Sequence, residues 1–171
     1  MDLKTKIRNI PDFPIKGVLF RDITTLFKDS EGYSCLIDTI ADSLKDKKVD
    51  LVIGPEARGF VIGSALAYAL KAGFVLARKP GKLPCETMKF EYGLEYGSDV
   101  LEIHKDAIQP GQRVVVVDDL LATGGTALAT CKLVEQAGGV VAGVRFAIEL
   151  ASEFDGRASL QEYDVESVMK F

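Results

Sequence analysis

VVVVDDLLATGGT, residues 114–126, joins a buried strand to a loop rich in glycine. The four valines have β-branched side chains that favour strands, and a run without polar alternation indicates a strand covered on both faces. Asp118 and Asp119 follow directly, and the small residues ATGGT precede a helical pattern. Ligands bind at the carboxyl ends of strands in parallel sheets. The stretch therefore predicts a site where two carboxylates lie beside a run of backbone amides.

Short apolar strands alternate with helices on both sides of this stretch. An amphipathic pattern through residues 33–44, with Asp29 or Ser30 as its cap, predicts the first helix. Further helices are expected over residues 60–73, closed by Gly73, and over 126–139; further strands are expected over 50–54, 74–78, 99–104 and 140–150. This alternation predicts an α/β protein with an open, mainly parallel twisted sheet and helices on both faces.

The chain of 171 residues fits a single domain, residues 1–171. Residues 1–30 read as irregular because Pro11, Pro14 and Gly17 interrupt them. Residues 80–98 contain prolines, glycines and mixed charge, which indicate a mobile loop or an extended hairpin. The last twenty residues carry little signal.

Composition excludes several classes of protein. The net charge of −4 argues against nucleic acid or an anionic membrane as a partner. No segment has the length of a signal peptide core or a bilayer span, so we expect a cytoplasmic protein. Cys35, Cys85 and Cys131 show no CxxC spacing, and His104 is the lone histidine, so a disulfide framework or a zinc site is not expected.

Two loops at predicted strand ends suit phosphate groups. ATGGT leads into a helix, whose N-terminal amides attract anions, but neither GxxxxGK[ST] nor GxGxxG occurs there. Carboxylates accept hydrogen bonds from a diol or bind a metal through water, so this loop and Asp118 and Asp119 suit a ribose 5-phosphate. The side chains of Asp118 and Asp119 can both reach one sugar only if the strand has ended by Asp119. GPEARGF, residues 54–60, offers a second anion site with Arg58.

A ligand phosphorylated at both ends, such as phosphoribosyl pyrophosphate (PRPP), would fit the two loops. Residues 114–126 resemble the PRPP motif of the type I phosphoribosyltransferase family. Other matching stretches point to its adenine-specific branch: DFPIKGVLFRDIT from residue 12, ARGF from 57, RKPGKLP from 78 and LEYGSDVLEIHKDAI from 94. The resemblance covers residues 12–126 and continues to about residue 150.

The resemblance implies an enzyme of purine salvage, a pentosyltransferase with PRPP and adenine as substrates. It would transfer phosphoribose to N9 of adenine and release AMP and pyrophosphate. Mg²⁺ would be the cofactor, bound mainly through PRPP and water with no firm direct protein ligand. The resemblance also implies a homodimer, a base-binding hood over residues 1–30 and a lid over 80–98.

The resemblance also implies roles for individual residues. The catalytic set is Glu95, Asp118, Asp119 and Arg58. The 5-phosphate would contact Ala122, Thr123, Gly124, Gly125 and Thr126. The pyrophosphate would contact Glu56, Ala57, Arg58, Arg78 and Lys82, with Arg78 in some members acting across the dimer interface. Adenine would contact Leu19, Phe20 and Arg21, and Tyr96 would close the lid.

Other interpretations stay open from the sequence. Arg58 could be a surface ion-pair partner, Phe20 plain core and Glu95 a solvated loop charge. The chain could serve another nucleobase, although Ala122 stands where hypoxanthine–guanine enzymes carry an acidic residue. It could also sense PRPP without catalysis, although 171 residues leave no room for a DNA-binding module.

Overall fold

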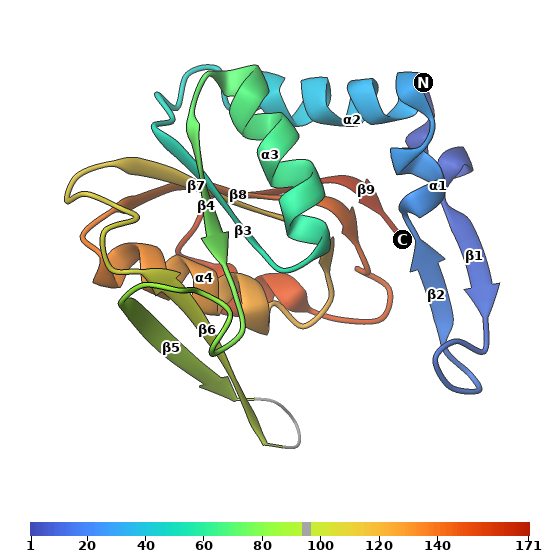
Figure 1. Ribbon diagram of the computed structural model, residues 1–171. Helices are drawn as coiled ribbons and strands as arrows, with labels where there is room; N and C mark the ends of the chain where they lie inside the picture. Colours follow the sequence, from blue (N-terminus) through green and yellow to red (C-terminus); the bar gives the residue numbers. More distant parts are fainter. Residues whose placement is uncertain (94–96) are drawn as a thin grey trace.

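Parallel strands form the central sheet of the computed structural model, which describes residues 1–93 and 97–171 (Figure 1). The sheet has five strands in the order β4–β3–β7–β8–β9, and every neighbouring pair is parallel. The strands are β3 (Leu51–Pro55), β4 (Gly73–Ala77), β7 (Arg113–Leu121), β8 (Val140–Glu149) and β9 (Val165–Lys170). The predicted open parallel sheet is confirmed.

Helices cover both faces of the sheet, as expected. Helices α2 (Ser30–Asp42) and α3 (Arg58–Leu70) lie above it in Figure 1, and α4 (Gly125–Gln136) lies below it. Val115 and Val117 belong to the core beneath α2 and α3, whereas Val114 and Val116 belong to the core beside α4. Successive side chains of a strand point to opposite faces of the sheet. Because helices cover both faces, all four valines are fully buried.

The N-terminal segment is more regular than its prolines suggested. It contains the 3₁₀ turn η1 (Leu3–Lys6), the antiparallel strands β1 (Arg8–Pro11) and β2 (Leu19–Asp22), and the short helix α1 (Thr24–Phe27). The expectation of an irregular segment was wrong because Pro14 and Gly17 lie in the turn that joins the two strands. This hairpin extends from one end of the molecule, beside the C-terminus (Figure 1).

Asp22 stabilises the base of this hairpin through hydrogen bonds. Its carboxylate accepts hydrogen bonds from Arg8 Nε at 2.9 Å and from the Thr24 amide at 2.9 Å and hydroxyl at 2.7 Å. The Thr24 hydroxyl, and next the Arg8 guanidinium, lower the pKa of Asp22 to about 2. A carboxylate with a lowered pKa stabilises the fold above its unfolded pKa, and this contribution is lost as pH falls through the folded pKa.

Asp22→Asn is therefore expected to destabilise the protein near neutral pH and to have little effect in strong acid. We expect a loss of about 1 kcal/mol in the free energy of unfolding near pH 7, because the charge on the acceptor is removed. The difference from the unmodified chain should shrink as pH falls from about 4 to about 2. Urea unfolding of both proteins near pH 7 and near pH 2 measures the difference in unfolding free energy. An equal difference at the two pH values would contradict this prediction.

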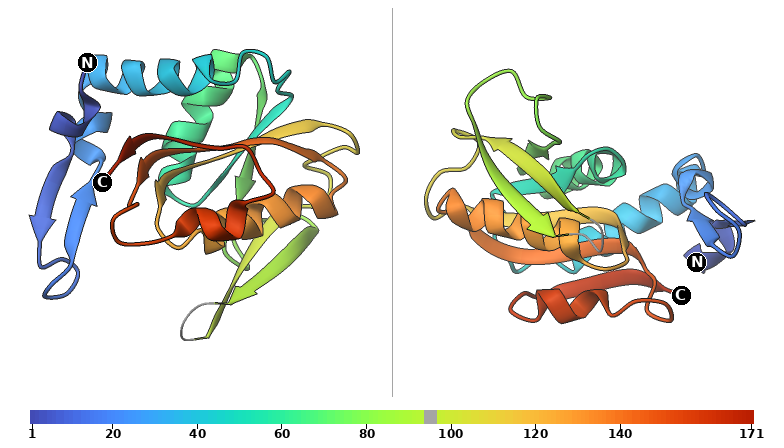
Figure 2. Two further views of the ribbon diagram at one scale, coloured as in Figure 1. Left: turned by 180° about the vertical axis from the view of Figure 1, so that it is seen from behind. Right: turned by 90° about the horizontal axis from the view of Figure 1, so that it is seen from below.

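A second hairpin connects β4 to β7. Strands β5 (Thr87–Gly93) and β6 (Ser98–His104) pair antiparallel, from Thr87 opposite His104 to Gly93 opposite Ser98. Of the two interpretations of residues 80–98, the extended hairpin is correct from Thr87 onward. Leu101 and Ile103 pack into the core beside α4, so the hairpin extends from that side of the sheet (Figure 2).

Helix α3 ends earlier than expected. Lys71 adopts the left-handed conformation with φ of 57°, and the amide of Ala72 donates to the carbonyl of Ala67 at 2.9 Å. Gly73 therefore begins β4 and pairs with Leu51, so the prediction that it closes the helix was wrong. The helix α2 begins as predicted, with the Asp29 carboxylate accepting from the Gly32 amide at 2.8 Å.

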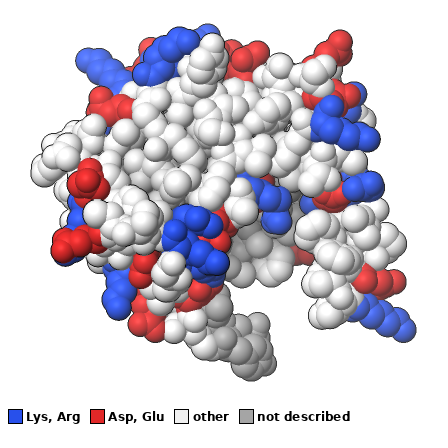
Figure 3. Space-filling model, viewed as in Figure 1, with Lys and Arg blue, Asp and Glu red and all other residues white. Residues whose placement is uncertain are grey.

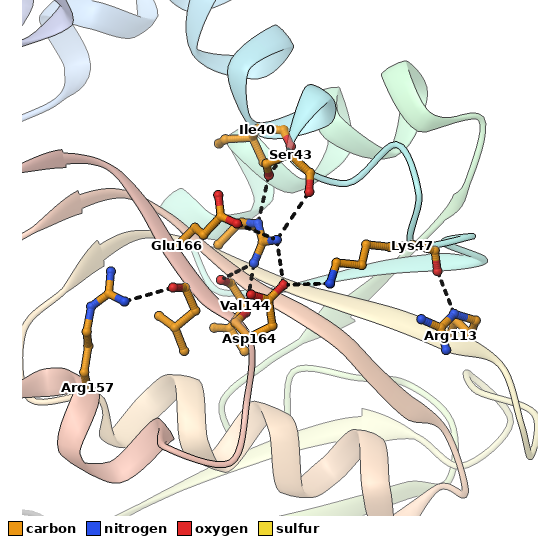
Figure 4. Close-up of polar contacts among 10 residues, drawn as sticks. Ile40, Ser43, Lys47, Arg113, Val144, Arg157, Asp164 and Glu166 are labelled. Carbon is orange, nitrogen blue, oxygen red and sulfur yellow. Dashed lines mark hydrogen bonds and ion pairs between the residues drawn. The ribbon is translucent and has the colours of Figure 1, made fainter.

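The last twenty residues form structural elements that the sequence did not predict. They include the 3₁₀ helix η2 (Gly156–Leu160) and the edge strand β9. Arg145, only 1% exposed, joins β8 to the segment before β9 and to the end of α2. It donates to Ser43 Oγ at 2.9 Å, to the Asp164 carbonyl at 2.8 Å and to the Asp164 carboxylate at 2.8 Å (Figure 4).

No helix within residues 1–93 and 97–171 is long and apolar enough to cross a membrane. Cys35, Cys85 and Cys131 are all free thiols. Cys131 is fully buried, and this burial raises its pKa to about 12.

Candidate active site

The candidate site lies where the strand order of the sheet reverses. Strands β3 and β7 are neighbours, but α3 leads from β3 to one side and α4 leads from β7 to the other. Loops at such a reversal diverge and leave a crevice at the carboxyl ends of the strands. A cavity of about 210 Å³ occupies this crevice. It is lined by Pro55, Glu56, Ala57, Arg58, Lys79, Tyr92, Asp99, Leu101, Asp118, Asp119 and Thr126.

Asp118 and Asp119 both line this cavity, although the strand does not end between them. Strand β7 continues to Leu121, so the expectation that it has ended by Asp119 was wrong. Asp119 is 6% exposed and forms an ion pair with Arg58. The Asp118 carboxylate accepts a hydrogen bond from the amide of Asp119 at 2.8 Å. The two carboxylates therefore reach one cavity while the backbone is still extended.

Burial, and next the charge of Asp119, raise the pKa of Asp118 well above its ordinary value of 3.8. The folded protein therefore favours the neutral acid at this position. For a group with a raised pKa, the contribution to stability is complete below the unfolded pKa and is lost as pH rises through the folded pKa. As pH rises towards neutral, the raised pKa of Asp118 therefore lowers the stability of the folded protein relative to the unfolded chain.

Asp118→Asn is expected to stabilise the ligand-free protein in mild alkali. The amide has nearly the same shape and stays neutral, so we expect a rise in Tm of about 2–4 °C near pH 8. The rise should vanish near pH 4, where the natural carboxyl is protonated in the folded state. Scanning calorimetry at the two pH values measures both Tm differences. A lower Tm than that of the unmodified chain near pH 8 would contradict this electrostatic account.

The predicted phosphate loop surrounds a second, adjoining cavity. Residues 122–124 connect β7 to α4, whose first two residues are Gly125 and Thr126, and Gly124 caps the helix with φ of 86°. This cavity has a volume of about 100 Å³, and Asp118 and Thr126 line both cavities. A helix N-terminus offers free amides and a positive dipole end, which together suit an anion.

The residues predicted to contact pyrophosphate separate into two groups. Glu56, Ala57 and Arg58 line the larger cavity. Arg78 lies next to them, with its Nε donating to Glu56 Oε1 at 3.3 Å. Lys82 is exposed and does not belong to the described lining of that cavity.

Three polar residues of the cavity wall were missed by the sequence analysis. Lys79 forms an ion pair with Asp99, and the hydroxyl of Tyr92 lies 3.3 Å from both Asp99 Oδ2 and Thr126 Oγ1. Lys79 follows the carboxyl end of β4, and this position could have marked it as a site residue. Tyr92 and Asp99 come from the hairpin, and their approach to the phosphate loop depends on tertiary packing.

Residues of the hood segment line a separate pocket of about 400 Å³ beside the 210 Å³ cavity. Its lining is Ile10, Phe13, Phe20, Arg21, Asp22, Ile23, Thr24 and Arg58. Arg58 borders this pocket and the 210 Å³ cavity, which makes them neighbours. Phe20 packs edge-to-face against Phe13, with ring centroids 5.1 Å apart.

The β2 residues predicted to contact adenine meet this pocket in different ways. Arg21 places its guanidinium over the ring of Phe171 at 4.5 Å and donates to Asn9 Oδ1 at 2.6 Å. Leu19 is 39% exposed and is absent from the described pocket lining. Glu95 and Tyr96 lie outside the described residues.

A family model described as a phosphoribosyl transferase domain matches residues 33–167. This range includes β3, β7 and the loops that follow them. The chain therefore belongs to the phosphoribosyltransferase family.

The relatives identify the branch of this family. Adenine phosphoribosyltransferase of Clostridium perfringens is 60% identical over 171 residues, which cover 100% of this chain and 99% of the relative. The crystal structure of the Thermoanaerobacter pseudethanolicus adenine phosphoribosyltransferase has a TM-score of 0.95 and 55% identity, and covers 99% of this chain and 98% of that one. The Saccharomyces cerevisiae adenine phosphoribosyltransferase, solved with an imino-altritol bisphosphate and adenine, has a TM-score of 0.91 and 40% identity over 98% of this chain and 96% of that one. The branch is that of the adenine phosphoribosyltransferases.

Proposed function

We propose that the protein transfers phosphoribose from PRPP to N9 of adenine and releases AMP and pyrophosphate. The observation that carries this proposal is that the three pockets are neighbours that share lining residues. Asp118 and Thr126 are shared by the phosphate-loop cavity and the 210 Å³ cavity, and Arg58 is shared by that cavity and the hood pocket. One ligand can therefore extend from the phosphate loop to Arg58 with a base beside it.

Each end of PRPP would meet chemistry that suits it. The 5-phosphate would accept hydrogen bonds from the amides at the start of α4, and Arg58 would donate to the pyrophosphate. Asp118 and Asp119 would accept hydrogen bonds from the ribose hydroxyls. As the bond to pyrophosphate breaks, positive charge develops on the sugar, and the two nearby carboxylates would stabilise it. Glu95 stays a predicted catalytic residue that would manage the proton on adenine.

The donor set of the site is compatible with Mg²⁺ bound through the substrate. Within the described parts of the chain, no group of three or more His, Cys, Asp or Glu side chains is placed to bind a metal ion. Asp118 and Asp119 can still accept hydrogen bonds from metal-bound water. We therefore propose that Mg²⁺ binds to the oxygens of PRPP and to water, where it would offset the charge of the leaving group.

Adenine is the favoured base for three reasons. The yeast relative was solved with adenine and a bisphosphate, which are the kinds of ligand that we assign to the three pockets. Backbone groups of Leu19 and Arg21 would pair with the 6-amino group and N1, and a 6-oxo purine would reverse donor and acceptor at both atoms. Ala122 also leaves the phosphate loop without the acidic residue of the hypoxanthine–guanine enzymes.

We also propose that the protein acts as a homodimer. The surface over α3 carries few charged side chains in the view of Figure 3. Between α2 and α3 this surface has a groove of about 710 Å³, where Tyr68 is 77% exposed. Weakly charged surfaces of this kind are common in subunit contacts. Light scattering at several protein concentrations would test the proposal, and the mass of a single chain at every concentration would contradict it.

A panel of nucleobases tests the proposed reaction. The purified protein is mixed with PRPP and Mg²⁺, and pyrophosphate release is followed with adenine, hypoxanthine, guanine, xanthine and orotate in turn. We expect turnover with adenine alone, and AMP as its product. Turnover with another base would overturn the choice of adenine. PRPP binding without turnover of any base would favour the alternative of a sensor protein.

A further inference from the structure

The 3₁₀ helix η2, which lies between β8 and β9 in the chain, packs directly against the phosphate loop. We propose that Arg157 is a positioning residue that fixes this loop for the 5-phosphate through η2. The proposal rests on the proposed function in one respect, the assignment of the 5-phosphate to residues 122–126. Arg157 does not line any of the three pockets described above.

Two glycines bring η2 and the loop into backbone contact. A Cβ atom on Gly124 would lie 2.4 Å from the carbonyl oxygen of Gly156 and 2.6 Å from Ser159 Oγ. A Cβ atom on Gly156 would lie 2.2 Å from the carbonyl oxygen of Ala122. Both distances are too short for any side chain, so each backbone limits where the other can move. The position of η2 therefore sets the position of the loop.

Arg157 fixes η2 to the ends of β8 and β9 that face it with three hydrogen bonds, two to Glu149 of β8 and one to Val165 of β9. Its Nε and Nη2 donate to the two carboxylate oxygens of Glu149, each at 2.8 Å. Its Nη1 donates to the carbonyl of Val165 at 2.9 Å, and Figure 4 shows this third bond. Such a two-bond arginine–carboxylate pair fixes direction as well as distance.

Glu149 is a suitable anchor because it is held in turn by the sheet. It is 6% exposed and ends β8, which pairs with β7 next to the phosphate loop. The Arg157 hydrogen bonds are the main cause that lowers the pKa of Glu149. The chain of contacts runs from Glu149 through Arg157 and Gly156 to Gly124.

Lys170 provides a matched control. Its ammonium lies 3.9 Å from Glu149 Oε2, so Lys170→Gln also removes a positive charge beside the same carboxylate. Lys170 lies at the end of β9, however, and its side chain is 58% exposed. A variant there changes the charge near Glu149 without releasing η2.

The test compares Arg157→Gln with Lys170→Gln in steady-state kinetics. For Arg157→Gln we expect KM for PRPP to rise about tenfold, with kcat and KM for adenine within about twofold of the unmodified enzyme. Lys170→Gln should leave all three constants unchanged. Arg157→Lys keeps the charge but loses the fork geometry, so we expect an intermediate KM for PRPP. Equal constants for the two glutamine variants would overturn the proposal.

Amide hydrogen exchange of the ligand-free protein gives a readout that does not depend on turnover. We expect Arg157→Gln, and independently Gly156→Ala, to speed exchange at residues 123–126 about tenfold, while Lys170→Gln does not. Unchanged exchange at this loop in both variants would also overturn the proposal. If the unmodified protein does not turn over adenine, the proposed function fails, and the exchange comparison still decides the role of Arg157.

Discussion

Asp119→Asn is expected to lower kcat/KM for PRPP by about 10³-fold while the protein stays folded. The carboxylate is 6% exposed and lies in the cavity with Asp118 and the guanidinium of Arg58, its partner in an ion pair. Removing its charge leaves the sugar with less stabilisation as positive charge develops, and it also frees Arg58 from its fixed direction. Both effects act on the transition state, so we expect kcat to fall more than KM rises.

Asp29→Asn is the matched control for this variant. Asp29 also pairs with a cation, since Lys6 Nζ lies 2.7 Å from its carboxylate, but it caps α2 and does not line the three pockets. Asparagine also caps helices well, so this variant should keep its kcat and KM. Steady-state kinetics and circular dichroism on both variants measure the two effects. A loss of less than about tenfold for Asp119→Asn would contradict its proposed role at the sugar.

Gly124→Ala is expected to raise KM for PRPP by about 100-fold and to cost about 2–3 kcal/mol of unfolding free energy. The residue has φ of 86°, which L side chains rarely adopt. The added methyl group would also meet the carbonyl oxygen of Gly156 at 2.4 Å, so the loop and η2 must separate. The 5-phosphate would then lose the aligned amides at the start of α4.

Gly111→Ala separates the effect of the backbone angle from the effect of the close contact with η2. Gly111 has nearly the same φ, 85°, but a Cβ atom there would meet no atom within 4 Å. It lies in the turn before β7, away from the site, so we expect a cost of about 1 kcal/mol and unchanged kinetics. Urea unfolding and KM measurements on both variants make the comparison. If Gly124→Ala resembles Gly111→Ala in both measurements, the close contact with η2 has no role in phosphate binding.

The features that the sequence predicted well depend on local patterns. Residues 114–117 indicated a doubly covered strand because continuous β-branched residues have few other uses, and the structure places all four side chains in the core. The loop of residues 122–126 was predicted because small residues between a strand and a helix suit an anion, and the structure places a cavity beside it. Asp118 and Asp119 were found with it, although the reason given for their shared direction was wrong.

The features that were missed depend on contacts between distant residues. Lys79 and Asp99 form an ion pair only because the hairpin folds back over the end of β4. Residues 156–160 gave no pattern of their own, and their role comes from a backbone contact with Gly124. The strands β1 and β2 have four residues each, too few for a clear alternation.

A crystal structure with PRPP, Mg²⁺ and an unreactive adenine analogue, such as 9-deazaadenine, would test the central claim most directly. We predict the 5-phosphate on the amides of residues 123–126, the ribose hydroxyls within hydrogen-bond distance of Asp118 and Asp119, and the pyrophosphate beside Arg58. The base should lie in the hood pocket against Phe20. A 5-phosphate bound away from the N-terminus of α4, or a base outside the hood pocket, would contradict the account.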